Sequence, residues 1–207
     1  MNQSEKEVLL GAGGKPLVKL IQIEDASNPK QSYGLYHMAL LLPSREDLAN
    51  VFKHLLDLKI LLVGGADHGY SEAIYLEDIE GNGIELYRDK PVTVWDIRED
   101  GRIIGVTEEL SAQDIYELGQ ELDPFVIASG TRMGHVHLSV KNSREASAFY
   151  QGSLGLKDKF TIPHASWIAS GNYHHLAVNE WGGKNLVRRK HGMVGLAYYV
   201  VEVENKE

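Results

Sequence analysis

Nine histidines and no cysteine occur among the 207 residues, so imidazole, carboxylate or carbonyl oxygen would have to hold any metal. Four residues that could bind a metal recur in a pattern. Each of two similar segments of the sequence carries one such residue on its first predicted strand and another on its last predicted strand. The pairs are His37 with Glu85 and His135 with His175, separated by 85 − 37 = 48 and 175 − 135 = 40 residues. Imidazole and carboxylate suit Fe(II), Mn(II), Ni(II), Co(II) or Zn(II), and two His with one carboxylate suit non-haem Fe(II). We predict one divalent metal site where the two segments meet.

Strand alternation assigns these side chains to one face of each predicted strand. His37 and Glu85 both fall on the less apolar face of their strands, and Tyr87 shares the face of Glu85. His135 and His137 share a face, so either could be the ligand of that strand. Tyr87 and His137 are therefore candidate catalytic residues, as acid–base groups or hydrogen-bond donors.

The last predicted strand contains two adjacent histidines. Alternation places His175 on the ligand face with Ala177, and it places His174 with Leu176 on the other face, where it would pack locally. The polar segment 67–72 is predicted as a loop that either forms an ordinary turn or lines the site. The predicted ligand set is thus His37, Glu85, His135 and His175.

The elements that position these residues follow a β-α-β-β-β order twice. In the first unit, strand 34–42 precedes a helix from Ser44 to about Leu58, and strands 60–63, 72–77 and 83–88 follow. In the second unit, strand 134–140 precedes a helix capped by Asn142 and ended by Gly155, and strands 157–162, 166–169 and 174–180 follow.

The remaining chain completes an α+β fold of repeated βαβββ modules, which form curved mixed sheets. We divide it into a partial N-terminal module (1–33), a complete module (34–90), a connector with a helix at 112–122 (91–131), a second complete module (132–182) and a partial C-terminal module (183–207). The N-terminal part carries strands 8–10 and 16–24, and the C-terminal part carries a strand at 195–203.

Composition excludes several classes of function. Lys and Arg number 21 and Asp and Glu 29, giving a net charge of −8, which argues against nucleic acid as a partner. No run of 18 apolar residues could span a membrane, and the polar segment Met1 to Glu7 lacks a signal core. We therefore expect a cytoplasmic protein that acts on a small molecule.

Longer stretches around these residues carry a family resemblance. They are Gly-Leu-Tyr-His-Met-Ala-Leu-Leu-Leu-Pro-Ser at 34–44, Asp-His-Gly-Tyr-Ser-Glu-Ala at 67–73, Gly-Asn-Gly-Ile-Glu-Leu-Tyr at 81–87, Met-Gly-His-Val-His-Leu-Ser-Val at 133–140 and Gly-Asn-Tyr-His-His-Leu at 171–176. Together they resemble bacterial catechol-2,3-dioxygenase-like proteins of the vicinal-oxygen-chelate superfamily, which includes glyoxalases, bleomycin-resistance proteins and extradiol dioxygenases. The resemblance covers most of the chain and implies four βαβββ modules, chelation of two vicinal oxygens on a divalent metal, and Fe(II) where catechols are cleaved.

The chain departs from the family pattern at both ends. The first module lacks its opening strand and helix, the fourth stops after one strand, and Tyr198 stands where an extradiol enzyme would offer His. We therefore expect the second module to pair with the third and to gather four ligands, as in glyoxalases. Unfinished modules expose strand edges, which predicts a homodimer unless the two terminal fragments complement each other within one chain.

The leading functional hypothesis is extradiol ring cleavage of a catechol-like substrate. One alternative is a glyoxalase-type isomerase or lyase acting on a 2-oxoaldehyde adduct. Another is a non-catalytic protein that binds a small molecule such as an antibiotic, and a third is a catalytically inactive remnant.

Overall fold

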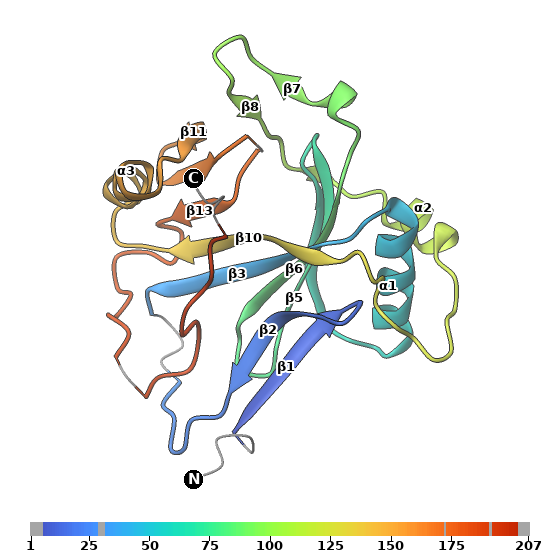
Figure 1. Ribbon diagram of the computed structural model, residues 1–207. Coiled ribbons are helices and arrows are strands. Elements are labelled where there is room, and N and C mark those ends of the chain that lie inside the picture. Colours follow the sequence, from blue (N-terminus) through green and yellow to red (C-terminus); the bar gives the residue numbers. More distant parts are fainter. Residues whose placement is uncertain (1–5, 29–31, 172, 191, 203–207) are drawn as a thin grey trace, which may run out of the picture.

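The computed structural model describes residues 6–28, 32–171, 173–190 and 192–202. A mixed sheet of nine strands runs through it in the order β11-β12-β13-β10-β3-β6-β5-β4-β9 (Figure 1). The strands of this sheet are β3 (Gly34–Leu41), β4 (Leu62–Asp67), β5 (Ser71–Glu77), β6 (Gly83–Asp89), β9 (Glu108–Glu109), β10 (Arg132–Ser139), β11 (Lys157–Ile162), β12 (Ala165–Ala169) and β13 (Leu176–Asn179). The helices are α1 (Arg45–Asp57), α2 (Ala112–Leu118) and α3 (Ser143–Leu154), with a short 3-10 turn at Val92–Val94.

Two β-α-β-β-β modules build the sheet, as predicted. The first is β3-α1-β4-β5-β6 and the second is β10-α3-β11-β12-β13, and they meet where β3 pairs antiparallel with β10. Within each module the first strand runs parallel to the last. The α+β fold class of repeated βαβββ modules is therefore confirmed, and the second and third modules of the sequence analysis are the ones that pair.

The ends of α1 and α3 follow from their capping residues. The Ser44 hydroxyl accepts from the Asp47 N–H at 3.0 Å, and Asn142 accepts from the first turn of α3. Gly155 ends α3 with φ 69°, in the left-handed region that glycine adopts without strain.

Both helices cover the same face of the sheet, where most of the apolar core lies. Leu86 and Leu48 belong to the cluster under α1, and Leu138 and Val178 belong to the cluster beside α3. The opposite face, called here the site face, carries a third cluster rich in tyrosine. Its buried members are Ala39, Leu41, Tyr70, Ala73, Tyr87, Ile103 and Tyr173.

Two β-bulges interrupt the β3–β10 ladder next to the histidines. Met133 pairs with Leu40 and His135 with Ala39, so Gly134 is an extra residue in β10. On β3, Tyr36 is the extra residue, and its ring packs on the rings of His37 and His137. A bulge changes the direction of a side chain locally. The bulge in β3 places Tyr36 on the site face.

The connector 91–131 reaches both faces of the sheet, because Ile103 packs in the tyrosine-rich cluster whereas Leu110, Ile115 and Phe125 pack in the cluster under α1. Its hairpin of β7 (Asp96–Ile97) and β8 (Ile103–Ile104) projects beyond the sheet in Figure 1, while Ile103 is buried in the tyrosine-rich cluster. The predicted helix 112–122 ends earlier, at Leu118. Gly119 leaves the helical conformation with ψ 142° and lies against the Ala49 carbonyl of α1, so the chain turns away there.

Several predicted strands differ from the structure, and strand 16–24 ends early, at Ile21. The strand predicted at 60–63 lies later in the chain, as β4 at Leu62–Asp67. The predicted loop 67–72 is the turn between β4 and β5, and its first and last residues belong to these strands. Strand 174–180 is shorter, at Leu176–Asn179. The predicted strand 195–203 does not form within its described residues, 195–202. Leu196 and Tyr199 of this segment pack on the cluster beside α3 instead. Residue 203 lies outside the described residues.

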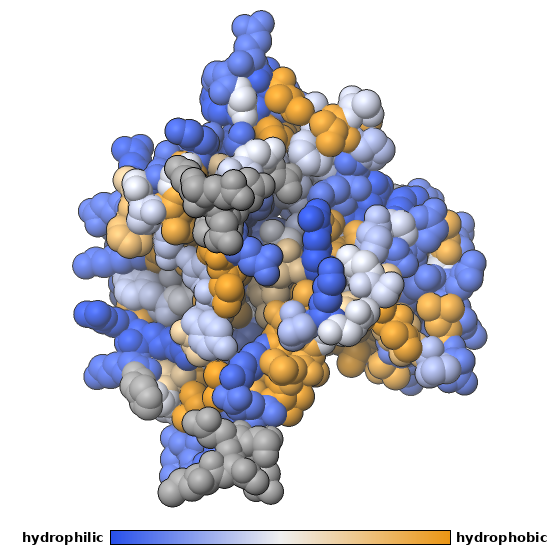
Figure 2. All heavy atoms as spheres, viewed as in Figure 1, coloured by the Kyte–Doolittle hydropathy of each residue, from blue (hydrophilic) through white to orange (hydrophobic). Residues whose placement is uncertain are grey.

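The N-terminal hairpin of β1 (Glu7–Ala12) and β2 (Lys15–Ile21) forms a separate two-stranded sheet. Glu7 and Lys19 form an ion pair on one side, and the other side carries Val8, Leu10 and Leu20, which are 55%, 48% and 48% exposed. Figure 2 shows apolar side chains gathered over this hairpin. Whether a second copy of the chain covers them stays a prediction. Within the described ranges, no helix combines the length and apolar character needed to cross a bilayer.

Candidate metal centre

Strand register brings three of the predicted ligands together around Ala39. In β3, Ala39 pairs with Glu85 of β6 on one side and with His135 of β10 on the other. His37 lies two residues before Ala39 and therefore on the same face. The buried methyl group of Ala39 leaves the space above it to the three longer side chains.

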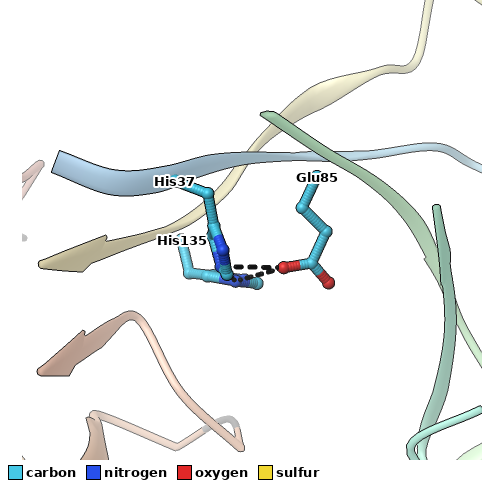
Figure 3. Close-up of side chains that lie close together, drawn as sticks. All are labelled: His37, Glu85 and His135. Atoms are coloured by element: carbon cyan, nitrogen blue, oxygen red, sulfur yellow. Dashed lines mark hydrogen bonds and ion pairs between the residues drawn. The ribbon is translucent and has the colours of Figure 1, made fainter. Parts of the chain in front are cut away.

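The ligand atoms of His37, Glu85 and His135 all lie within 4.8 Å of one another. Glu85 Oε2 is 2.9 Å from His37 Nε2 and 3.0 Å from His135 Nε2, and the two Nε2 atoms are 3.3 Å apart (Figure 3). The three residues are 8%, 3% and 3% exposed, so the group is shielded from water.

Electrostatics in this group favour an ionised Glu85 carboxylate. Burial raises the pKa of Glu85, but His135 and His37 outweigh burial and hold that pKa well below its ordinary value. Burial lowers the pKa of His135, although Glu85 opposes that shift. A buried carboxylate flanked by two imidazole nitrogens that can act as Lewis bases is a donor set that suits a divalent cation. The donor set therefore fits a divalent metal.

His175, the fourth predicted ligand, does not join this group. Its side chain is exposed, and its Nδ1 accepts from the Ser170 N–H at 3.3 Å. The regular ladder of β13 begins only at Leu176, so alternation does not fix the directions of the two residues before it.

His174 points into the site instead, contrary to its predicted local packing on the other face. It is 5% exposed, and its ring centroid lies 3.9 Å from that of His135. Burial and the neighbouring His135 keep its pKa well below the ordinary value. Its Nδ1 is buried and has no hydrogen-bond partner among the described residues, so this atom is available to a bound molecule.

A second pair missed by the sequence analysis is His68 and Tyr75. His68 Nδ1 lies 2.8 Å from the Val106 carbonyl and its Nε2 lies 2.7 Å from the Tyr75 hydroxyl. The carbonyl can only accept, so Nδ1 carries a proton. Burial and the nearby Glu85 raise the pKa of Tyr75, which keeps its hydroxyl protonated. Two sequence signals pointed to His68: the polar character of segment 67–72, and the stretch 67–73 that carries part of the family resemblance.

The two predicted catalytic residues lie on the site face but are enclosed. Tyr87 is 2% exposed, its ring centroid is 5.2 Å from that of His135, and burial raises its pKa. His137 is also 2% exposed, and its Nε2 lies 2.9 Å from Asn179 Nδ2. Burial holds the pKa of His137 well below its ordinary value. Both residues are thus better placed to support the metal group than to transfer protons.

Comparisons with known proteins agree with this architecture. A Bacillus subtilis (strain 168) protein named catechol-2,3-dioxygenase is 32% identical over 213 residues, covering 100% of this chain and 74% of that protein. A crystal structure from Bacillus subtilis, provisionally described as a dioxygenase, matches 84% of this chain with a TM-score of 0.50 and 11% identity. The chain spans about half the length of that solved structure, 50%. Methylmalonyl-CoA epimerase from Mycobacterium tuberculosis aligns over 70% of this chain and 86% of its own, at 13% identity and a TM-score of 0.38. A search of protein-family models found no match.

The chain combines two paired βαβββ modules with a group of two His and one Glu shared between them. Together with the 32% identical relative, this architecture shows that the chain belongs to the vicinal-oxygen-chelate superfamily. The solved structure at 11% identity supports the fold alone.

Proposed function

We propose that this chain is an Fe(II)-dependent extradiol dioxygenase that opens the ring of a catechol-like substrate beside its two hydroxyl groups. The observation that carries the proposal is the buried group of two His and one Glu, whose ligand atoms all lie within 4.8 Å. This donor set is the one that non-haem Fe(II) oxygenases use, with coordination positions left open for substrate. The name of the 32% identical relative supports the same reaction.

The number of converging ligands favours ring cleavage over the glyoxalase-type alternative. A glyoxalase-like site was expected to use His175 as a fourth ligand, but that side chain is exposed. The site instead offers three ligands and, beside them, the unpartnered Nδ1 of buried His174. Three ligands leave more of the coordination sphere to a bidentate substrate and dioxygen.

Fe(II) held by His37, Glu85 and His135 would supply Lewis-acid activation of two adjacent hydroxyls and redox activation of dioxygen. Both atoms of dioxygen enter the ring-opened product, so the reaction needs no external reductant. Substrate binding requires the loss of a hydroxyl proton, and the chain offers a base for it. His174 is held neutral by burial, and its Nδ1 is free to accept that proton.

Tyr75 and His68 would act beside Glu85 and His37. The Tyr75 hydroxyl lies between His68 Nε2 and the Glu85 carboxylate, so it can hold the carboxylate in place or donate to a substrate oxygen. His68 lies in a half-buried turn, where its Nδ1 donates to the Val106 carbonyl and its Nε2 accepts from the Tyr75 hydroxyl. The pair therefore provides a path for protons within a water-excluded site.

The test compares metal content and ring cleavage in matched His→Ala variants. Protein purified without chelators and reconstituted anaerobically with Fe(II) should convert simple catechols to ring-opened products. His37→Ala and Glu85→Ala should abolish metal retention while circular dichroism shows an intact fold. His175→Ala is the matched control, since it removes an exposed imidazole of the same predicted set, and it should retain full metal content.

Full metal occupancy in both His37→Ala and Glu85→Ala, by elemental analysis, would place the metal elsewhere and refute the proposal. Metal retention with no cleavage of any catechol, but with isomerisation of a 2-oxoaldehyde–thiol adduct, would favour the glyoxalase-type alternative. Tight binding of aromatic compounds without metal or turnover would favour a binding protein. A cytoplasmic location and a homodimer stay predictions.

A further inference from the structure

Asn179, the last residue of β13, is fully buried, and both ends of its side-chain amide have a defined partner. Its Oδ1 accepts from the Trp181 backbone N–H at 3.0 Å. A backbone N–H can only donate, so this contact fixes which end of the amide is oxygen. The Nδ2 end therefore faces His137 and donates to its Nε2 at 2.9 Å.

This hydrogen bond determines the tautomer of His137. Because Nε2 accepts, the ring proton of the neutral imidazole resides on Nδ1. A ring flip would break the bond with Asn179 and leave a buried amide group unpaired, at a cost typical of lost buried hydrogen bonds. Asn179 thus holds the His137 ring in one orientation.

The orientation of His137 matters because its ring packs on His37. The two ring centroids are 4.8 Å apart and the planes are at 88°, which is an edge-to-face contact. A metal-ligating His ordinarily donates its second ring N–H to a carbonyl or carboxylate, which orients the ring. Within the described residues, His37 Nδ1 has no such partner, and the ring instead contacts Tyr36, Tyr75 and His137.

We propose that Asn179 is a positioning residue for the metal centre, acting through His137 on His37. The proposal rests on the proposed metal site. The Trp181 N–H fixes the Asn179 amide, Asn179 fixes the His137 ring, and the His137 ring packs on His37. This ring packing takes the place of the hydrogen bond that His37 Nδ1 lacks. It thereby directs His37 Nε2 toward Glu85, in the same module, and toward His135, in the other module.

The experiment begins with the metal-free protein, where nitrogen NMR of ¹⁵N-labelled His137 reports the tautomer directly. The expected result is protonated Nδ1 in the wild type. The opposite tautomer would overturn the proposal regardless of whether the site binds metal.

The second measurement is Co(II) titration with visible absorption, which reports ligand geometry as well as affinity. In Asn179→Ala, Co(II) affinity should fall by about 10–100-fold and the Co(II) spectrum should change, as for other residues that orient metal ligands. Asn179→Ser, which keeps a hydroxyl able to accept from the Trp181 N–H, should show the same changes and guards against misfolding of the first variant. The matched control is Asn142→Ala, which removes the cap of α3 and lowers stability without touching the site.

Unchanged Co(II) affinity and spectrum in both Asn179 variants would mean that Asn179 serves the fold alone, and would overturn the proposal while leaving the proposed function intact. A wild-type protein that binds no Co(II) would overturn the metal site and this inference together.

Discussion

Replacing Gly134 by Ala tests how tightly the bulge in β10 is packed against the metal centre. The added methyl group would lie 1.9 Å from the Tyr87 hydroxyl oxygen and 2.6 Å from Cζ. Ordinary van der Waals contact begins at 3.4 Å, so Tyr87 or the strand must move by 3.4 − 1.9 = 1.5 Å. Neither can move freely, because Tyr87 is 2% exposed and both neighbours of Gly134 are paired to β3. We therefore expect a destabilisation of about 3 kcal/mol, at the upper end for overpacked cores.

Thermal unfolding of chelator-treated protein measures this effect without a contribution from bound metal. For a chain of this size, about 3 kcal/mol corresponds to a fall in Tm of roughly 6–12 °C. Gly152→Ala is the matched control, because Gly152 lies in α3 with no atom near its added methyl group, and that substitution should stabilise by about 0.5–1 kcal/mol. Adding Tyr87→Phe to Gly134→Ala should recover part of the loss, since it removes the atom in closest contact. If Gly134→Ala melts at the wild-type temperature, Tyr87 is not confined as the structure indicates.

Three further predictions address other parts of the molecule. Tyr75→Phe should retain metal but lower turnover by about 100-fold, because it removes a proton donor beside Glu85; unchanged turnover in steady-state assays would remove Tyr75 from the mechanism. The Glu180 carboxylate accepts from the Ser143 N–H and hydroxyl at the start of α3, and mainly the backbone bond lowers its pKa from 4.5 to about 2. The ionised Glu180 stabilises the fold above pH 4.5, and this stabilisation is lost as the pH falls toward 2. At pH 7, Glu180→Gln should therefore lower the free energy of unfolding by about 1 kcal/mol after solvent screening. The difference from the wild type should disappear in acid. Light scattering at micromolar concentration should show a dimer that covers the exposed β1–β2 side chains, and a mass near 23.1 kDa would contradict it.

Local sequence signals were sufficient for the modules and for the faces of their central strands. Ser44, Asn142 and Gly155 act on backbone groups within a few residues of themselves, so the ends of α1 and α3 could be predicted without knowing the fold. Alternation placed His37 and Glu85 on one face because the β3–β6 ladder is regular from His37 onward.

The placements that the sequence analysis missed depend on features that no single segment encodes. His174 and His175 precede the ladder of β13, and where that ladder begins depends on pairing with β10 and β12, far away in the chain. Tyr36 reaches the site face only because a bulge opposite His137 interrupts alternation. Tyr75 faces Glu85 through the register of β5 on β6, which the sequence alone does not specify.

The division of the metal group between two modules has a consequence for how the chain is made. His37 and Glu85 belong to one continuous stretch of chain, whereas His135 comes 135 − 85 = 50 residues after Glu85. At ribosomal speeds of about 5–20 residues per second, the nascent protein presents two ligands for roughly 2.5–10 s before the third is synthesised. If the metal binds as proposed, His37 and Glu85 would form an incomplete site during that interval, and abundant divalent cations other than Fe(II) could occupy it. Selection of the metal would then be completed only when the second module docks, which would link the order of synthesis to the identity of the bound ion.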